Sequence, residues 1–317
     1  MYISVNYLTL LIISDIYLRS PLPLLYLLYN ERERISYIMM KTLYLSDLDG
    51  TLLNYKAEIS DFSKQKLNEL IANGANFSVA TARTVATVKH ILDGVNLCLP
   101  IILMNGVLIY DFASESYLRK CAISNDIVAN ILAVLKSKNS TALMYKIQDN
   151  QQITYFENSR NEHLAVFIEE RQQRYQKPFC EVSFDDVSLD DTIYFTMLDT
   201  QENLLPVYEA LKGIAELRME MYLDIYSDTL WYLEIFSTKA SKKTAALYLK
   251  EQLNVKTMIG FGDNLNDLPL FEACDFACAV GNAKDEVKAV ADVVIGDNNG
   301  DGVVRWLEQQ TFENKCD

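Results

Sequence analysis

Histidine and the common catalytic and metal-binding motifs are scarce in this sequence. Only two histidines are present, His90 and His163, and they lie far apart and outside any HExxH or similar spacing. The six cysteines form no CxxC pair, and no GxSxG motif occurs. These absences argue against a zinc ribbon, a disulfide framework and histidine-based hydrolysis. Carboxylates are therefore the expected reagents if the protein is an enzyme.

Positive charge is also in short supply. The 29 Lys and Arg residues face 43 Asp and Glu residues, which leaves a net charge of −14. Such a surplus of carboxylates repels the phosphates of nucleic acids and of anionic lipids. We therefore expect no nucleic-acid partner and no stable membrane association. With half of its 317 residues hydrophobic, the chain can bury the core of one very large domain or of two ordinary ones.

The first 39 residues differ in composition from the rest. The apolar run from Tyr7 to Ser14 is far shorter than the roughly 20 residues that cross a bilayer. Asp15, Arg19, Pro21 and Pro23 interrupt its extension. The segment also lacks the basic start and the small-residue cleavage site of a signal peptide.

Three interpretations of this segment are open: a weak membrane-interface anchor, an additional packed element, or a translated stretch upstream of a start at Met39 or Met40. We favour the last, because a compact α/β pattern begins at Lys41 and its first strand needs nothing upstream.

From Thr42 onward, short apolar runs alternate with helical patterns. The runs TLYLS, FSVAT and IILMN have the appearance of buried parallel strands, as in βαβ units. The pattern resumes with TMIGF from Thr257, ACAV from Ala277 and DVVI from Asp292, which we expect in the same sheet. The spacing of apolar residues predicts helices behind Ser60 and before Gly94.

The stretch between these two parts has a different rhythm. It predicts a hairpin around Asp149-Asn150, a long helix over residues 159–176, a helix over residues 202–212 and further strands. We therefore predict an α/β protein with a Rossmann-like, doubly wound parallel sheet. Residues 40–124 and 237–317 form this discontinuous core, and residues 125–236 form an inserted α+β cap. Residues 1–39 are an amino-terminal extension. If translation starts at Met39 or Met40, this extension is not part of the native protein.

Four carboxylates are predicted at one edge of the sheet. Asp47 and Asp49 end the first strand, where residues i and i+2 project to the same side, and Gly50 allows a sharp turn. Asp263 and Asp267 follow a later strand at the same carboxyl edge, where open α/β sheets bind ligands. Their mutual repulsion requires protonation or a cation, and ligands that are all oxygen favour Mg²⁺.

Two further residues supply what phosphoryl transfer requires. Thr81 ends the FSVAT strand and Lys242 begins a helix, so both can donate hydrogen bonds to phosphate oxygens. Each of these features is common on its own. Paired acids, a threonine in a strand or a lysine at a helix start is usually a solvated or capping residue. The combination, with each element at a predicted strand or helix end, indicates phosphoryl transfer.

With these residues assembled, the chain resembles the haloacid dehalogenase superfamily of phosphohydrolases. DLDGT matches the first motif of that family, the Thr of VATAR the second, the Lys of STKASKK the third and GDNLND the fourth. The place and length of the insert are similar to the C2B cap of the Cof-like branch, class IIB. Met104-Asn105-Gly106 and the stretch from Val280 to Ala283 are also family-like. The resemblance begins at about Lys41.

The resemblance implies a two-step reaction and a magnesium site. Asp47 would attack phosphorus to give an aspartyl phosphate, while Asp49 would serve first as the acid and then as the base. Mg²⁺ would be held by Asp47, by the backbone carbonyl of Asp49 and by Asp263. Asp267 would be an outer or water-mediated ligand that also orients Lys242.

The resemblance also implies a set of groups that bind the substrate. Thr81 and Lys242 would hold the phosphoryl oxygens, and Arg83, Asn105 and Asn266 would support them. The sequence departs from the family pattern at two places where glycine is common, Ala82 and Lys243. Neither departure removes a reacting group.

We therefore expect a cytoplasmic, Mg²⁺-dependent phosphatase of small phosphorylated metabolites, with sugar phosphates favoured, acting as a monomer or weak homo-oligomer. A phosphosugar mutase would share the aspartyl phosphate and is not excluded by the motifs. A non-catalytic sugar-phosphate sensor would be expected to lack Asp47 or Asp49, and both are present. A membrane-attached phosphatase that uses residues 1–39 is a further alternative.

The upstream-start interpretation makes a prediction about the native chain. The intact mass of the protein purified from its own cells should correspond to a chain that begins near Met39 or Met40. A mature amino terminus at Met1 would show this interpretation to be wrong.

Overall fold

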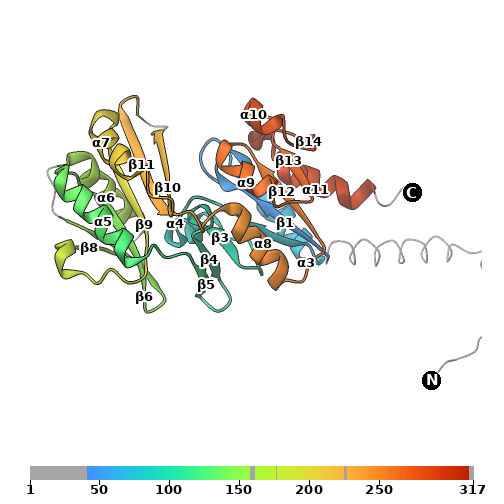
Figure 1. Cartoon of the computed structure of the whole chain (residues 1–317). Coiled ribbons are helices and arrows are strands. Elements are labelled where there is room, and N and C mark those ends of the chain that lie inside the picture. The colour runs from blue at the N-terminus through green and yellow to red at the C-terminus, as the bar shows by residue number, and fades with distance from the viewer. Residues whose placement is uncertain (1–40, 158–160, 176, 225–226, 314–317) are drawn as a thin grey trace, which may run out of the picture.

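The computed structural model describes residues 41–157, 161–175, 177–224 and 227–313. The predictions for residues 1–39 lie outside the described residues. Within these ranges the chain forms two units side by side, each built around its own sheet (Figure 1). Among the described residues, no helix has the length and apolar composition required to cross a bilayer.

The first unit contains a parallel sheet of five strands in the order β14-β13-β12-β1-β2. Its strands are β1 (Thr42–Ser46), β2 (Asn76–Val79), β12 (Thr257–Gly262), β13 (Phe276–Ala279) and β14 (Val293–Val294). Strand β1 lies between β12 and β2 and is buried along its whole length, because both of its edges and both of its faces are covered. The strands predicted at the two ends of the chain therefore do join one parallel sheet.

Helices cover both faces of this sheet. They are α3 (Asp61–Ala72), α4 (Val85–Ile91), α8 (Lys242–Gln252), α9 (Leu268–Phe271), α10 (Asp285–Lys288) and α11 (Gly302–Glu313). Leu43 and Leu45 of β1 pack with residues of α8 and α9, whereas Tyr44, on the opposite face, packs with residues of α3 and α11. The predicted doubly wound α/β fold is thus confirmed.

Local sequence signals set the limits of α3. The Ser60 side chain accepts a hydrogen bond from the Ser63 amide and so caps the helix start. Gly74 has a φ of 93°, a left-handed conformation that favours glycine after a helix. Both signals were read correctly from the sequence.

The IILMN run differs from its prediction. The prediction was a strand of the parallel sheet, but β3 (Ile101–Leu103) pairs antiparallel with β4 (Leu108–Asp111), which in turn pairs with β5 (Ser116–Lys120). A single parallel bridge, Ala80 to Ile102, connects β3 to the chain after β2. The β4–β5 hairpin, absent from the prediction, supplies β3 with a closer partner than β2.

The second unit, which we call the insert, runs from Asn125 to Ser237. Its sheet has the order β10-β11-β9-β6-β7-β8. The strands are β6 (Leu143–Gln148), β7 (Gln151–Phe156), β8 (Phe179–Glu181), β9 (Thr192–Thr200), β10 (Leu217–Leu223) and β11 (Leu230–Ser237). The helices are α5 (Asn125–Ser137), α6 (Glu162–Tyr175) and α7 (Gln201–Leu211). The predicted hairpin is present, with Asp149 and Asn150 both at positive φ.

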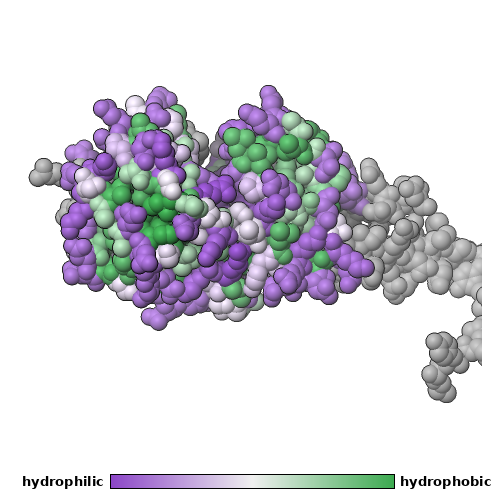
Figure 2. Space-filling model, in the orientation of Figure 1, coloured by the Kyte–Doolittle hydropathy of each residue, from purple (hydrophilic) through white to green (hydrophobic). Residues whose placement is uncertain are grey.

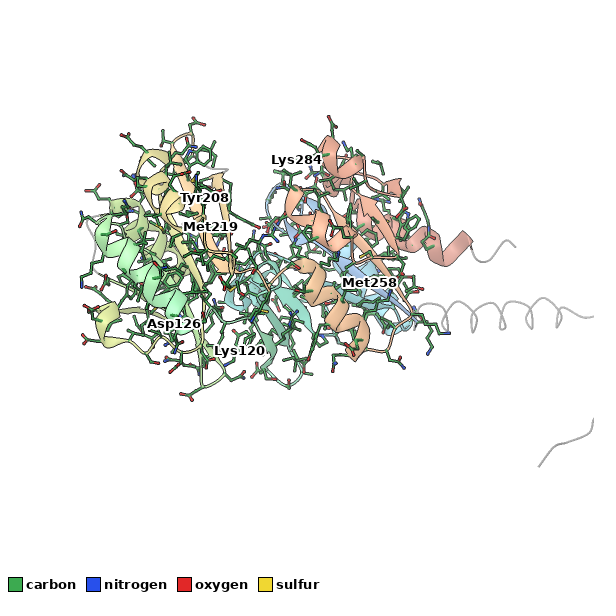
Figure 3. The ribbon with its side chains drawn as sticks, viewed as in Figure 1. Lys120, Asp126, Tyr208, Met219, Met258 and Lys284 are labelled. Carbon is green, nitrogen blue, oxygen red and sulfur yellow. The ribbon has the colours of Figure 1, made fainter. Side chains whose placement is uncertain are left out.

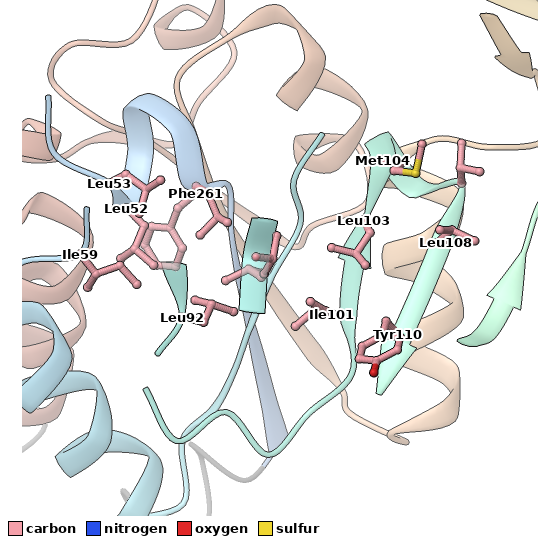
Figure 4. Packing of buried hydrophobic residues seen from close by; sticks show 14 of the residues in the cluster. Leu52, Leu53, Ile59, Leu92, Ile101, Leu103, Met104, Leu108, Tyr110 and Phe261 are labelled. Atoms are coloured by element: carbon pink, nitrogen blue, oxygen red, sulfur yellow. The ribbon is translucent and has the colours of Figure 1, made fainter. Parts of the chain in front are cut away.

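The insert sheet contacts the first unit through the β6–β7 hairpin. The Asn150 side chain accepts from the Tyr117 amide at 3.0 Å and donates to the Glu115 carbonyl at 2.7 Å. Gln152 donates to the Met104 sulfur at 3.4 Å. Met104 belongs to the turn between β3 and β4, where buried apolar side chains meet (Figure 4).

The face of the molecule shown in Figure 2 is mostly hydrophilic, with apolar side chains gathered in the region of α5 and α7 and at the top of the first unit. On the inner side of these two helices lie Met144, Phe195 and Leu233 of the insert sheet.

The turn Met104–Gly106 generates a stability prediction. Gly106 has a φ of 94°, and a Cβ at this position would overlap the backbone carbonyl of Ser241 at the start of α8. Gly106→Ala should therefore lower the unfolding free energy by about 1–3 kcal/mol or more, measured by urea denaturation. Gly213→Ala is the matched control, since nothing lies within 4 Å of its Cβ position. Equal midpoints for the two variants would contradict this assignment.

Candidate active site

A buried ammonium between two buried carboxylates forms the centre of the site. Lys242 Nζ lies 2.6 Å from Asp47 Oδ1 and 2.6 Å from Asp267 Oδ1. All three residues are almost completely inaccessible to solvent. The pairing joins the end of β1, the start of α8 and the loop after β12, three places that are far apart in the sequence.

The local sequence positions each member of this cluster. The Asp47 amide donates to the Phe261 carbonyl at 2.9 Å, which continues the β1–β12 pairing by one residue. Lys242 is the first residue of α8, behind Ser241, whose side chain forms a capping box with Thr244. The lysine side chain therefore starts from a fixed helix end and reaches the edge of the sheet.

The two carboxylates keep Lys242 charged. Burial alone would lower its pKa, but the charges of Asp267 and Asp47 and their hydrogen bonds outweigh burial and raise it. A buried ion pair of this kind requires its partners, because removal of one leaves an uncompensated charge in the interior.

Asp263 lies next to this cluster. The Thr51 hydroxyl donates to Asp263 Oδ1 at 2.8 Å. Gly50, with a φ of 74°, lies so close that a Cβ would overlap the Asp263 carboxylate. Burial, followed by the charge of Asp267, raises the pKa of Asp263 to about 6.

The three aspartates fit a hard divalent cation. One carboxylate oxygen from each of Asp47, Asp263 and Asp267 lies within 4.8 Å of the others. Both oxygens of Asp267 already accept hydrogen bonds, Oδ1 from Lys242 and Oδ2 from the Asp263 and Asn264 amides. No hydrogen bond within the described residues uses Oδ2 of Asp47 or of Asp263. These two oxygens, one on the buried Asp47 and one on the partly buried Asp263, suit the oxygen-rich coordination that Mg²⁺ prefers.

The fourth predicted carboxylate, Asp49, has a different surrounding. Both of its oxygens accept from the Arg83 guanidinium, at 2.7 Å from Nε and 2.6 Å from Nη2. The Asp49 side chain is half exposed and is outside the three-aspartate cluster. Arg83, predicted to bind substrate, is therefore engaged with Asp49 in this structure, and its role toward substrate stays a prediction.

The structure brings the remaining predicted residues to the same sheet edge. Thr81 is completely buried, and its hydroxyl oxygen accepts from the Arg83 amide at 3.2 Å. The Thr81 carbonyl accepts from the Asn105 amide at 3.0 Å. Asn266 donates from its side chain to Asn105 Oδ1 at 3.3 Å. These contacts connect the second and fourth motifs around the aspartate cluster.

Sequence reasoning missed some of the supporting contacts. Thr51 was quoted as part of DLDGT, but its bond to Asp263 was not foreseen. Asn282 donates to the Gly50 carbonyl at 2.7 Å and accepts from the Asn298 amide at 3.0 Å, so it ties the first turn to the carboxyl-terminal part of the chain. The signal for Asn282 was its place in the family-like stretch from Val280 to Ala283.

Comparison with known proteins identifies the family. The profile of the haloacid dehalogenase-like hydrolases matches residues 44–307. The chain belongs to this family. Among its relatives is phosphatase YwpJ of Bacillus subtilis. The two sequences are 28% identical over 284 residues, and the alignment covers 83% of this chain and 97% of YwpJ.

Two solved structures share the fold. TM0651 of Thermotoga maritima superposes with a TM-score of 0.70 at 25% identity, over 84% of this chain and 96% of that protein. The subclass IIB sugar phosphatase BT4131 superposes with a TM-score of 0.65 at 21% identity, over 86% of this chain and 99% of that one. Both matches span nearly the whole of the related chain, so the fold similarity includes the insert.

The Lys242 cluster yields a stability prediction. Lys242→Met should leave two buried carboxylates without a counter-charge and lower the unfolding free energy by about 3–5 kcal/mol, measured by urea denaturation in chelator at neutral pH. Lys243→Met is the matched control, because Lys243 makes only an exposed pair with Glu272 at 3.0 Å. The control should change stability by less than about 1 kcal/mol. Similar losses in both variants would contradict the role given to Lys242.

Proposed function

We propose that this protein is a Mg²⁺-dependent phosphatase that hydrolyses small phosphorylated metabolites through a phosphorylated Asp47. The observation that carries the proposal is the buried Asp47–Lys242–Asp267 cluster beside Asp263 at the carboxyl edge of the parallel sheet. This edge is where open α/β sheets bind ligands. The relatives named as phosphatases support the same reaction class.

Asp47 is the acid best suited to be the nucleophile. Both oxygens of Asp267 already accept hydrogen bonds. Asp263 accepts a hydrogen bond from the Thr51 hydroxyl, and Gly50 packs against its carboxylate. Asp47 and Asp263 each keep one oxygen without a hydrogen bond among the described residues, so the choice of Asp47 over Asp263 rests on the match of DLDGT to the first motif of the family. The Asp47 carboxylate attacks phosphorus, the bond from phosphorus to the leaving alcohol breaks, and an aspartyl phosphate forms.

The surrounding groups hold the phosphoryl group and offset its charge. The Lys242 ammonium and the Thr81 hydroxyl act on its oxygens, both from rigid positions at the end of a helix or a strand. Asp47 and Asp263, with the Asp49 backbone carbonyl, would hold Mg²⁺, and Asp267 would act through water or through Lys242. When bound, the cation offsets negative charge on the phosphoryl oxygens and neutralises the crowded carboxylates.

Asp49 carries the protons. It gives one to the leaving oxygen in the first step, and in the second it takes one from the water that attacks phosphorus and frees Asp47. In this structure both Asp49 oxygens accept from Arg83. Asp49 must therefore separate from Arg83, at least at one oxygen, before it can donate a proton. Arg83 would then be free to bind the phosphoryl group.

The size of the insert and the acidic surface favour a small substrate. One phosphate can be held by Lys242 and a bound cation despite the net charge of −14. BT4131 is named a sugar phosphatase, and another relative, YbhA of Escherichia coli, a pyridoxal phosphate phosphatase. We favour sugar phosphates and place the enzyme in the cytoplasm as part of the proposal.

The direct test is the replacement of the nucleophile. Asp47→Asn should lower phosphate release from a panel of phosphomonoesters by at least about 10³-fold, with unchanged circular dichroism, because an amide cannot form the acyl phosphate. Removing Mg²⁺ with chelator should abolish turnover of the wild type, and adding it back should restore turnover. Asp126→Asn is the control, since Asp126 is exposed on α5 in the insert (Figure 3). Full activity of Asp47→Asn would refute the assignment.

A further inference from the structure

A cavity of about 370 Å³ lies between the first unit and the insert. We call it the junction cavity. Its walls include Lys89 of α4 and Tyr117 of β5 on one side, and Asp149, Gln152 and Lys177 of the insert on the other. None of the residues assigned to the phosphatase reaction lines it. Its volume is in the range of small-molecule sites.

Lys177 is the unusual member of this lining. Its exposed fraction is only 7%. No carboxylate of the described residues pairs with its ammonium, which lies instead 4.7 Å from the centre of the Tyr145 ring and 5.5 Å from that of Phe179. Burial, together with the charge of Arg171, lowers the pKa of Lys177 to about 7. Lys177 Nζ is not among the described side-chain atoms that are both inaccessible to solvent and without a hydrogen bond, so this nitrogen faces the cavity and can donate to a group bound there.

The other buried lysines of the described chain have partners. Lys242 is held by Asp47 and Asp267. Lys146 donates to the Ser188 carbonyl, and it lines a neighbouring cavity that does not include Lys177. Lys177 differs from these two lysines because no described residue accepts a hydrogen bond from its ammonium.

In the junction cavity the acidic side chains are exposed, whereas Lys177 is buried. The two acids of the cavity lie at its rim: Glu115 has a side chain that is 73% exposed and already pairs with Lys89 at 3.2 Å, and Asp149 is exposed in the hairpin turn. The inner part of the cavity contains the buried Lys177 and the buried amide of Gln152. The interior of the cavity therefore offers hydrogen-bond donors, and its acids are turned toward solvent.

We propose that the junction cavity binds a small anionic group, a carboxylate or a phosphate, whose oxygens accept hydrogen bonds from the Lys177 ammonium. The site is separate from the Asp47 centre and does not depend on the proposed reaction. Because its walls come from both units, an anion bound there would also hold the insert against the first unit.

The test is the titration of Lys177 in the full-length protein. Selective ¹³C,¹⁵N labelling of lysine allows each side chain to be followed by NMR, with the Lys177 signal assigned by its loss in Lys177→Met. Inorganic phosphate or acetate, at ionic strength matched with chloride, should raise the pKa of Lys177 by about one pH unit or more. Lys146 is the internal control and should keep its titration curve.

Two results of this titration would contradict the proposal. If the Lys177 titration is unchanged by both phosphate and acetate, or if Lys146 shifts by the same amount, the proposal is wrong. Lys177→Met should fold, because Met removes an unpaired ammonium from the interior while keeping most of the side-chain volume.

A second experiment distinguishes an anion of the substrate from a free anion. The values of kcat/KM are compared for 6-phosphogluconate, which carries a distal carboxylate, and for glucose 6-phosphate, which does not. A preference of about tenfold that is lost in Lys177→Met and kept in Lys146→Met assigns the anion to the substrate. The NMR response without such a preference assigns it to a free anion. If neither compound is hydrolysed, the proposed phosphatase activity is contradicted. The NMR titration then remains the test of anion binding in the junction cavity.

Discussion

The Lys242 ammonium, shared between the carboxylates of Asp47 and Asp267, is the interaction on which the rest of the site depends. Each of the three charges is buried, and the single ammonium is the only counter-charge that the two carboxylates have within the cluster. They come from β1, from α8 and from the loop after β12, so the cluster forms only when the parallel sheet has formed. Asp263, Thr51 and Gly50 then pack around it at distances that leave no space for a side chain on Gly50.

The insert is connected to this cluster through the chain itself. Its last strand, β11, ends at Ser237, and only Thr238 to Ser241 separate that strand from Lys242. At another contact with the first unit, Gln152 bonds to Met104, next to Asn105 and the packed Gly106 turn. A displacement of the insert would therefore act on the segments that carry Lys242 and Asn105. The position of the insert and the geometry of the site are physically coupled.

Much of this arrangement could be predicted because it depends on local pattern. Apolar runs predicted β1, β2 and β12, and polar residues at their carboxyl ends predicted Asp47, Thr81 and Asp263 at one edge. The antiparallel β3–β4 pairing could not be predicted, since the short apolar run Ile101–Met104 is equally compatible with either partner. The Asp49–Arg83 pair and the unpaired Lys177 also escaped prediction, because they depend on how distant side chains meet and not on sequence spacing.

The central claim is that Asp47 becomes phosphorylated, and chemical trapping of the acyl phosphate tests it most directly. Wild-type protein quenched during turnover of a phosphomonoester and reduced with borohydride should contain homoserine in place of the aspartate at position 47, as identified by peptide mass spectrometry. Protein quenched without substrate should contain none. Phosphate release without homoserine at this position, or with homoserine at Asp263 instead, would contradict the account.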